Sequence, residues 1–211
     1  MNRRTILVFA VAAYIASSLS ARVLAAPGPV DVKAILNDPE APVGGNPDGD
    51  VTIVAFLDYN CPFCKKAMPA LAKLVAADRG VRLVYKDWPI LAASSVDGAR
   101  MALAAKYQGE YEQAHAALMA VPGRSSRERM AEAIRKAGVD MTRLEADLKT
   151  HDGEISALIN RNRDEADSLG LEGTPVFLIG PFKVAAALDY EGLKRVVEQA
   201  RERQNGAAPA Q

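Results

Sequence analysis

The segments with a strand pattern in this chain of 211 residues stand far apart, and the stretch between them has none. Val51–Leu57 is a continuous run of apolar and β-branched residues bounded by turn residues, which is typical of a buried strand. Residues 81–85 and Val176–Ile179 show similar runs, whereas residues 92–170 carry only helix signals. We therefore predict an α/β protein in which one sheet domain is interrupted by an all-helical insertion.

A helix is predicted directly after the first strand. Pro62 suits the first position of a helix, where its missing N–H costs no hydrogen bond, and Gly80 ends the helix before the next strand. The predicted buried stripe of this helix consists of Met68, Leu71, Leu74 and Val75. A strand, a helix and a strand in this order predict a βαβ unit with two parallel strands.

Further signals divide the rest of the chain. Ser125 with Glu128 predicts a capping box, and Asp140 predicts the cap of a following helix. Residues 26–50 are rich in Pro, Gly, Asn and Asp, so we expect a lead-in segment whose apolar residues 30–36 form an edge strand. The predicted units are a sheet domain of residues 51–91 and 171–204, a helical insertion of residues 92–170 and a flexible tail of residues 205–211.

The first 25 residues have the order of a secretory signal peptide. Arg3 and Arg4 precede an apolar run over residues 6–15, and small residues lead to a cleavage point after Ala25. We expect residues 1–25 to be removed on export; the alternative is an uncleaved membrane anchor. Removal takes away three arginines and no acid, which leaves 23 basic and 26 acidic side chains. This mildly acidic chain excludes nucleic-acid binding driven by bulk positive charge.

Cys61 and Cys64 are the only cysteines, and three interpretations compete for the Cys-Pro-Phe-Cys segment. A metal site needs two further ligands, and the only histidines, His115 and His151, lack a paired ligand spacing. A structural disulfide across so short a loop stabilises little. A redox pair is favoured, because Cys61 stands at a helix start, where free N–H groups and the helix dipole stabilise a thiolate. Cys64, one turn further, is expected to be shielded and close enough for a disulfide.

Four segments carry a resemblance to a known family: Phe56-Leu57-Asp58-Tyr59-Asn60-Cys61-Pro62-Phe63-Cys64-Lys65-Lys66, Trp88-Pro89-Ile90-Leu91, Gly173-Thr174-Pro175 and Ala187-Leu188-Asp189-Tyr190-Glu191-Gly192-Leu193. Together they resemble the DsbA-like thiol-disulfide oxidoreductases of the thioredoxin superfamily. The resemblance covers nearly the whole mature chain. It implies a thioredoxin fold with an inserted all-helical subdomain.

The same resemblance implies roles for individual residues. Cys61 corresponds to the nucleophile and Cys64 to the resolving thiol, while Pro175 corresponds to a cis-proline that faces them. From the residues alone, the turn before Val176 would carry a trans bond, since a cis X-Pro bond costs about 0.5 to 1 kcal/mol; the resemblance reverses this expectation. A cis bond would leave the backbone of Thr174 free to pair with an extended substrate. The supporting residues of the expected active site are Pro62, Phe63, Thr174 and Pro175.

These implications lead to a functional hypothesis. We expect a periplasmic thiol-disulfide oxidoreductase that uses no cofactor or metal and binds no nucleic acid. Its expected partners are unfolded or extended cysteine-containing polypeptides and a membrane-bound redox protein that recycles the cysteine pair. The short lead-in segment favours a monomer. A dithiol oxidase is the first hypothesis, a disulfide isomerase or reductase the second, and a non-catalytic chaperone or binding module the third.

Two positions depart from the family pattern, and a third is a known variant within it. Many relatives carry a glutamate six residues before the first cysteine, where this chain has Ala55. The strongest oxidants have histidine between the cysteines, where this chain has Phe63, so we predict a potential between about −120 mV and about −270 mV, the values of DsbA and thioredoxin. Thr174 before the proline is frequent in isomerase-like and reductase-like relatives, which leaves the direction of transfer open.

Overall fold

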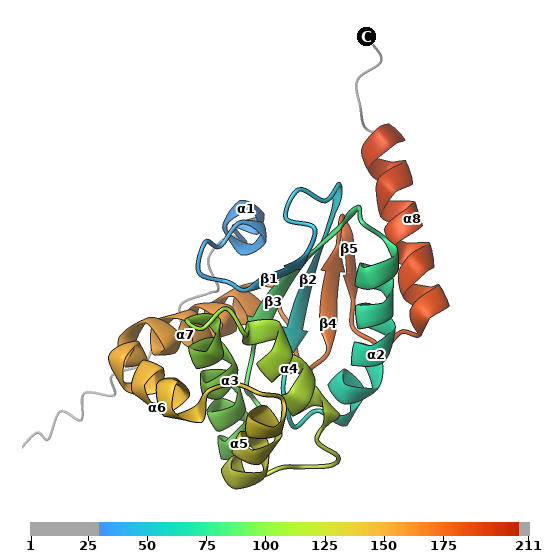
Figure 1. The fold of residues 1–211 in the computed structure, drawn as a ribbon. Helices are drawn as coiled ribbons and strands as arrows, with labels where there is room; N and C mark the ends of the chain where they lie inside the picture. The colour runs from blue at the N-terminus through green and yellow to red at the C-terminus, as the bar shows by residue number, and fades with distance from the viewer. Residues whose placement is uncertain (1–29, 207–211) are drawn as a thin grey trace, which may run out of the picture.

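The computed structural model describes residues 30–206, which form a five-stranded sheet and eight helices (Figure 1). The strands are β1 (Val43–Gly45), β2 (Val51–Leu57), β3 (Val81–Asp87), β4 (Val176–Ile179) and β5 (Phe182–Val184). The helices are α1 (Val32–Leu36), α2 (Pro62–Ala77), α3 (Ala93–Lys106), α4 (Tyr111–Ala120), α5 (Arg127–Lys136), α6 (Met141–Thr150), α7 (Asp152–Ser168) and α8 (Tyr190–Gly206). The predicted signal peptide lies outside the described residues, as do residues 207–211 of the predicted tail. α8 itself continues through residues 205–206.

β2 lies at the centre of the sheet, whose strand order is β1-β3-β2-β4-β5. β2 and β3 are parallel from Val51 opposite Val81 to Leu57 opposite Asp87, and α2 connects them. The predicted βαβ unit is therefore confirmed. β4 pairs with the other side of β2 in the antiparallel direction, which brings the chain after the insertion next to the end of β2.

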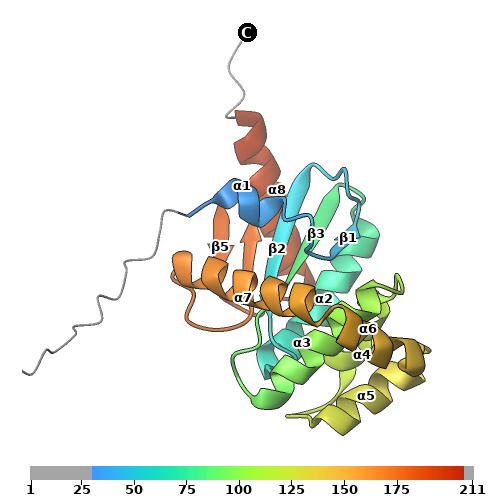
Figure 2. The same ribbon diagram turned by 90° about the vertical axis from the view of Figure 1, so that its left-hand side faces the viewer.

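The side chains of β2 alternate between two cores. Ile53, Ala55 and Leu57 belong to the core that includes buried residues of α2 and α8, whereas Val54 and Phe56 belong to a second core with residues of α1 and α7. Figure 2 shows α1 and α7 on one face of the sheet, with α2 and α8 behind it. Burial on both faces explains the continuous apolar run that predicted this strand.

The helical insertion lies between β3 and β4. Helices α3 to α6 stand beside α2 at the end of the sheet where β2 ends, and α7 returns across one face of the sheet (Figures 1 and 2). The predicted fold class, an α/β sheet domain with an inserted helical subdomain, is confirmed.

Two local predictions are wrong. Residues 30–36 contain α1 rather than an edge strand, because the Asp31 side chain accepts a backbone hydrogen bond of 2.9 Å and caps a helix. The edge strands of the sheet are β1 and β5. The cap of α5 is Ser126 rather than Ser125, since the Ser125 N–H donates instead to Asn60 Oδ1 at 2.7 Å.

A buried ionic group fixes the segment after α1 to the sheet and to α7. Lys86 of β3 is 0% exposed, and its Nζ donates to Asp38 Oδ2 at 3.1 Å and to Glu165 Oε1 at 3.0 Å. Arg161 Nε donates to the same Asp38 oxygen at 2.9 Å. Burial raises the pKa of Asp38, but the hydrogen bonds from Arg161 and Lys86 outweigh it and hold this pKa at about 2. Removing one partner would leave a buried charge without a counter-charge. The segment after α1 therefore binds to the sheet in one position.

Candidate active site

Cys61 lies where the central strand passes into a helix. β2 ends at Leu57, and Cys61 is the N-cap residue of α2, which begins at Pro62. The Sγ atom of Cys61 accepts a hydrogen bond of 3.3 Å from the backbone N–H of Cys64. The cysteine sulfur therefore occupies the position of a capping oxygen, at the positive end of the helix dipole.

A second contact of Cys61 comes from the turn before β4. Its Sγ lies 3.1 Å from the carbonyl oxygen of Thr174, to which the protonated thiol donates, although the two residues are 113 positions apart. The peptide bond between Thr174 and Pro175 is cis. The pairing of β4 with β2 explains this approach, because it places the entry to β4 beside the end of β2.

The two thiols differ strongly in acidity. Hydrogen bonds from the Cys64 thiol, Thr174 and backbone N–H groups of α2 lower the pKa of Cys61 from 9.0 to about 6, against the opposing effect of burial. Burial and the bond to Cys61 raise the pKa of Cys64 well above its usual range, and its side chain is 0% exposed. Both cysteines are free thiols in the structure. Near neutral pH the pair therefore holds a thiolate at Cys61 and a proton at Cys64.

Cys61 is buried, with an exposed fraction of 2%. The neighbouring Phe63 is 61% exposed. A groove of about 490 Å³ lies between Phe63, the turn of Thr174 and Pro175, and residues 185–187. Thr174, whose carbonyl oxygen lies 3.1 Å from Cys61 Sγ, lines this cis-proline groove.

Two buried polar residues hold the loop before Cys61, a role that the sequence motifs did not indicate. The Asp58 carboxylate accepts hydrogen bonds from Ser95 Oγ at 2.7 Å and from the backbone N–H groups of residues 90–91. Asn60 Nδ2 donates to Ser95 Oγ at 3.1 Å, and Asn60 Oδ1 accepts from the Ser125 N–H. The loop is thereby bound to the helical insertion. The sequence signal that could have indicated this role is the presence of Asp58 and Asn60 on either side of Tyr59, because Asp and Asn side chains often stabilise turns.

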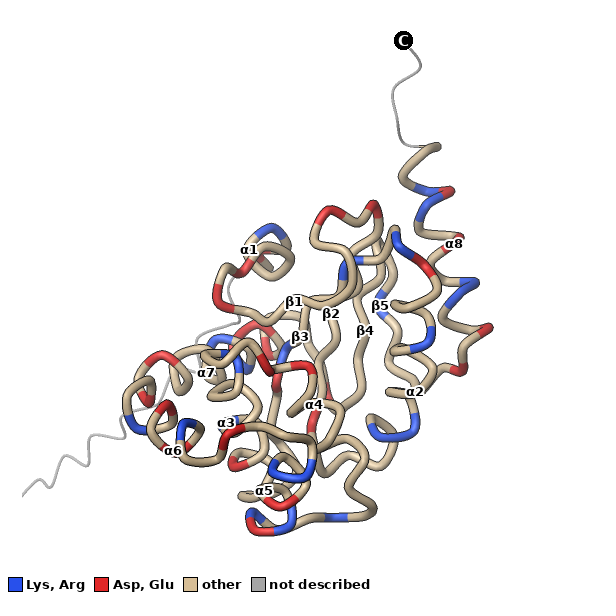
Figure 3. The backbone as a smooth tube through the Cα atoms, viewed as in Figure 1, with Lys and Arg blue, Asp and Glu red and all other residues tan. Residues whose placement is uncertain are grey.

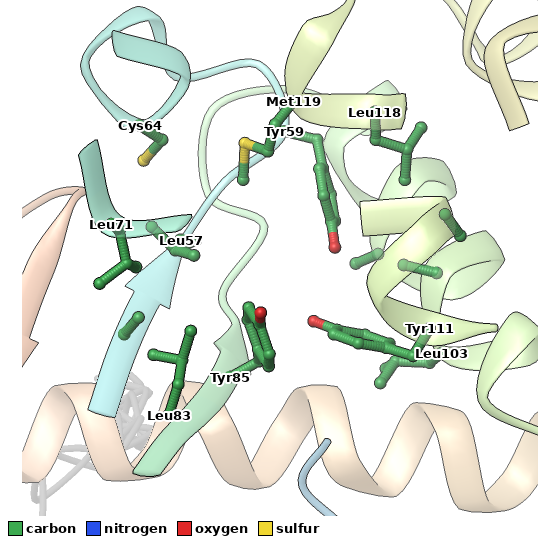
Figure 4. Close-up of a cluster of buried hydrophobic side chains, with 14 of the residues drawn as sticks. Leu57, Tyr59, Cys64, Leu71, Leu83, Tyr85, Leu103, Tyr111, Leu118 and Met119 are labelled. Carbon is green, nitrogen blue, oxygen red and sulfur yellow. The ribbon is translucent and has the colours of Figure 1, made fainter. Parts of the chain in front are cut away.

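A buried polar cluster lies behind the loop. Figure 4 shows Tyr59, Tyr85 and Tyr111 pointing toward one another beside the apolar side chains of the core. Tyr59 OH lies 2.9 Å from Nδ1 of His115, and burial lowers the pKa of this histidine to about 3. His115 is therefore a buried, neutral core residue. Ala55 is 0% exposed and stands opposite Tyr85 in the β2–β3 register, so no acid occupies the position of the family glutamate.

α2 carries three lysines and no acidic residue (Figure 3). Lys65, in the first turn of α2, is half-buried. Its Nζ donates to the carbonyl oxygens of Val121 and Gly123, each at 2.6 Å. Lys65 thus ties the first turn of α2 to the loop that follows α4, while Lys66 is exposed.

A Cys-x-x-Cys pair at a helix start, facing a cis-proline on a mixed sheet, defines the class of thiol-disulfide oxidoreductases with a thioredoxin fold. A sequence profile of the family described as Thioredoxin matches residues 37–199. The chain belongs to this thioredoxin family and is of the DsbA-like type.

Many solved structures are similar to the chain, among them those of three thioredoxin-like proteins. A thioredoxin-like oxidoreductase from Silicibacter pomeroyi DSS-3 is 42% identical, with a TM-score of 0.76 over 82% of this chain and 98% of the other. The thiol-disulfide exchange protein alpha-DsbA2 from Wolbachia pipientis is 28% identical, with a TM-score of 0.75 over 79% and 90% of the two chains. A periplasmic thioredoxin-like protein from Salmonella enterica serovar Typhimurium is 30% identical, with a TM-score of 0.67 over 79% and 93%.

Curated relatives are much longer than this chain. Na(+)/H(+) antiporter NhaA 1 of Mycolicibacterium gilvum is 28% identical over 84% of the chain, and Na(+)/H(+) antiporter NhaA 3 of Salinispora tropica is 30% identical over 86%. The chain spans 30% and 29% of their lengths, respectively. Among residues 30–206, no helix combines the length and the apolar character that crossing a membrane requires.

Proposed function

We propose that the protein is an exported dithiol oxidase that introduces disulfides into secreted proteins through Cys61 and Cys64. The observation that carries the proposal is the difference between the two thiols, with a pKa of about 6 at Cys61 and a raised pKa at Cys64. A stabilised Cys61 thiolate favours the reduced form of the pair over its disulfide. The oxidised pair is therefore poised to take electrons from a substrate dithiol.

The reaction proceeds by two thiol-disulfide exchanges. A substrate thiolate attacks Sγ of Cys61 in the disulfide form, and the sulfur of Cys64 leaves and takes up a proton. A second substrate thiolate then attacks the substrate sulfur of this mixed disulfide, and Cys61 leaves as a thiolate. The substrate loses two electrons and gains a disulfide, while the cysteine pair is reduced. A disulfide-bearing redox protein then reoxidises Cys61 and Cys64.

The residues around the cysteines have proposed supporting roles. Pro62 starts α2 without losing a backbone hydrogen bond. The backbone of Thr174, held by the cis bond to Pro175, pairs with an extended substrate as an added strand. Phe63 contributes apolar contact area at the edge of the cis-proline groove.

The proposed location is the periplasm, reached through a cleavable signal peptide of residues 1–25. The similarity to a periplasmic thioredoxin-like protein of Salmonella supports this location. The proposed partners are extended or unfolded cysteine-containing polypeptides and a membrane-bound redox protein, with the chain acting as a monomer. The proposed domain limits are residues 51–91 and 171–204 for the thioredoxin-like domain and 92–170 for the insertion.

A disulfide isomerase or reductase of the same fold is the second candidate. It is favoured by Phe63, which cannot stabilise a neighbouring thiolate as an imidazolium does. A glutathione redox titration and the redox state of the cysteines in the native compartment separate the candidates. A potential between about −120 mV and about −270 mV with largely oxidised cysteines supports the oxidase. Largely reduced cysteines support an isomerase or reductase and contradict the oxidase.

A non-catalytic chaperone or binding module is the third candidate, and the variant Cys61→Ser tests it. An oxidoreductase loses turnover in this variant, whereas a binding module keeps its polypeptide affinity and its cellular role. The companion variant Cys64→Ser retains the nucleophile and should accumulate mixed disulfides with substrates, which mass spectrometry identifies.

A further inference from the structure

A long groove lies on the other side of the first turn of α2 from the cis-proline groove. It encloses about 1260 Å³ between α2 and α4, and Leu83 and Tyr85 of β3 contribute to its lining. The lining extends from Pro62, the residue after Cys61, to Arg79, just beyond the end of α2. One end of this α2–α4 groove therefore adjoins the cysteine pair.

The walls of the α2–α4 groove are apolar and built from small or flexible side chains. Met68 of α2 and Met119 of α4 line it, and thioethers adapt to apolar partners of different shapes. Exposed alanines occur on both helices, namely Ala72, Ala76, Ala116 and Ala120. Their short side chains leave room for an occupant between the two helices.

Hydrogen bonds hold the walls in place. Lys65 joins the first turn of α2 to the loop after α4 through the carbonyl oxygens at residues 121 and 123. Nε2 of His115 on α4 lies 3.3 Å from Sδ of Met68 on α2. Because the two helices are linked at these points, the groove exists before an occupant arrives, which reduces the entropy cost of binding.

We propose that the α2–α4 groove binds an apolar segment of the substrate polypeptide that adjoins the cysteine bonded to Cys61. This inference rests on the proposed function. A chain held covalently at Cys61 can reach the groove past Pro62, and the covalent bond gives its neighbouring residues a high effective concentration there. α2 has 16 residues and spans about 24 Å, which corresponds to about seven residues of extended chain.

Charge at the far end of the groove indicates how the segment ends. The Arg79 guanidinium has no carboxylate within 4.0 Å among the described residues. Glu112, also in the lining, already accepts a hydrogen bond of 3.0 Å from Tyr85 OH. An acidic residue would complement Arg79. The inferred substrate class has a cysteine, about seven mainly apolar residues, and then Asp or Glu.

The test measures how fast thiols reduce the oxidised full chain, with acid quenching and mass detection of free cysteines. The probes are glutathione and three single-cysteine peptides. The first peptide has seven apolar residues and a terminal Asp, and the second has the same residues but ends in Lys. In the third, polar residues replace the seven apolar residues. Each peptide is made in two forms, one with the cysteine at its N-terminal end and one with the cysteine at its C-terminal end. Two peptide thiols are oxidised to one peptide disulfide for each protein disulfide reduced, as with glutathione.

Two variants separate the groove from the cysteine chemistry. Ala116→Trp fills the groove from an exposed position of α4, and Ala146→Trp on the exposed surface of α6 is its matched control. We expect Ala116→Trp to lower the rate at which the apolar peptide reduces the disulfide by about tenfold. The rate with glutathione should stay at the wild-type value, and both rates should stay unchanged in the control variant. Arg79→Glu should reverse the preference for Asp over Lys, whereas Arg195→Glu on the exposed side of α8 should not.

The outcomes distinguish the inference from the proposed function. Unchanged peptide rates in Ala116→Trp, or an unchanged Asp preference in Arg79→Glu, overturn the groove inference while glutathione still reduces the pair. If neither glutathione nor any peptide reduces the wild-type disulfide, the proposed function itself is wrong.

Discussion

Tyr111 and Asp87 share a buried hydrogen bond, in which the tyrosine hydroxyl donates to Asp87 Oδ2 at 3.0 Å. Burial raises the pKa of Asp87 from 3.8 to about 7, even though bonds from Tyr59 and Tyr111 oppose this shift. The folded protein therefore keeps the Asp87 proton over a pH range in which the unfolded chain has lost it.

Asp87 should make the protein less stable as the pH rises from about 4 to about 7. The folded state binds more protons than the unfolded state in this range, so the free energy of unfolding falls with pH, by on the order of 2 to 4 kcal/mol. Asp87→Asn should flatten this part of the profile, measured by urea unfolding. The exposed Asp48→Asn is the control. A profile of Asp87→Asn that keeps the wild-type slope contradicts the prediction.

The alkylation of reduced Cys61 by iodoacetamide should increase with pH around a midpoint of about 6. Cys64→Ala removes the thiol that contributes most to this lowered pKa, and its midpoint should move upward. The stability that the thiolate gives to the reduced protein is present above about pH 9, the unfolded value, and is lost as the pH falls through about 6. A midpoint near 9 in the wild type would refute the assignment.

Phe63→His should make the cysteine pair more oxidising. Phe63 is 61% exposed, so the substitution does not disturb the core, and an imidazolium beside Cys61 further stabilises the thiolate. Each unit by which the pKa of Cys61 falls raises the potential by about 30 mV. Glutathione titration of Phe63→His and of the uncharged control Phe63→Leu measures the difference. Equal potentials in the two variants would show that residue 63 does not tune the pair.

Ala55→Glu should change the pH dependence of attack by Cys64 on a mixed disulfide. Ala55 is 0% exposed, so a carboxyl group there has a raised pKa and can accept the Cys64 proton. Stopped-flow resolution of a Cys61–glutathione adduct gives the rate as a function of pH. Ala55→Gln has the same volume without the proton and serves as the control. If both variants resolve the adduct at the wild-type rate, proton transfer does not limit this step.

Asn60→Ala should lower the free energy of unfolding by about 1 to 3 kcal/mol. The variant leaves the buried Ser125 N–H without the acceptor that it has at 2.7 Å, and it also loses the bond from Asn60 Nδ2 to Ser95. Asn205→Ala, at the exposed end of α8, is the control for chemical denaturation. Equal stability of the two variants would mean that the loop before Cys61 is not held by Asn60.

Elements with a strong local pattern could be predicted from the sequence. β2 and α2 carry this information in the run Val51–Leu57 and in the position of Pro62 after Cys61. Short elements could not be predicted in the same way. The five residues of α1 are apolar enough for a strand, and only the hydrogen bond that caps the helix at Asp31 favours a helix over a strand.

The cysteine pair was visible in the sequence, and the family resemblance indicated Thr174 and Pro175 beside it, whereas the residues that hold the loop before Cys61 were not visible. Asp58 and Asn60 act through Ser95 and Ser125, whose positions depend on how the insertion packs against the loop. The contact between Cys61 and Thr174 depends on the β2–β4 pairing. Such long-range contacts arise from the tertiary fold and leave no periodic signal in the chain.

The ionic group of Lys86, Asp38 and Arg161 also determines where material can be joined to the protein. It fixes α1 on the face of the sheet that α7 covers, opposite α2 (Figure 2). A carrier protein, a surface linker or a fluorescent label attached at Val30 would therefore start on the far side of the sheet from the α2–α4 groove. Immobilisation through this end leaves the α2–α4 groove open to macromolecular substrates.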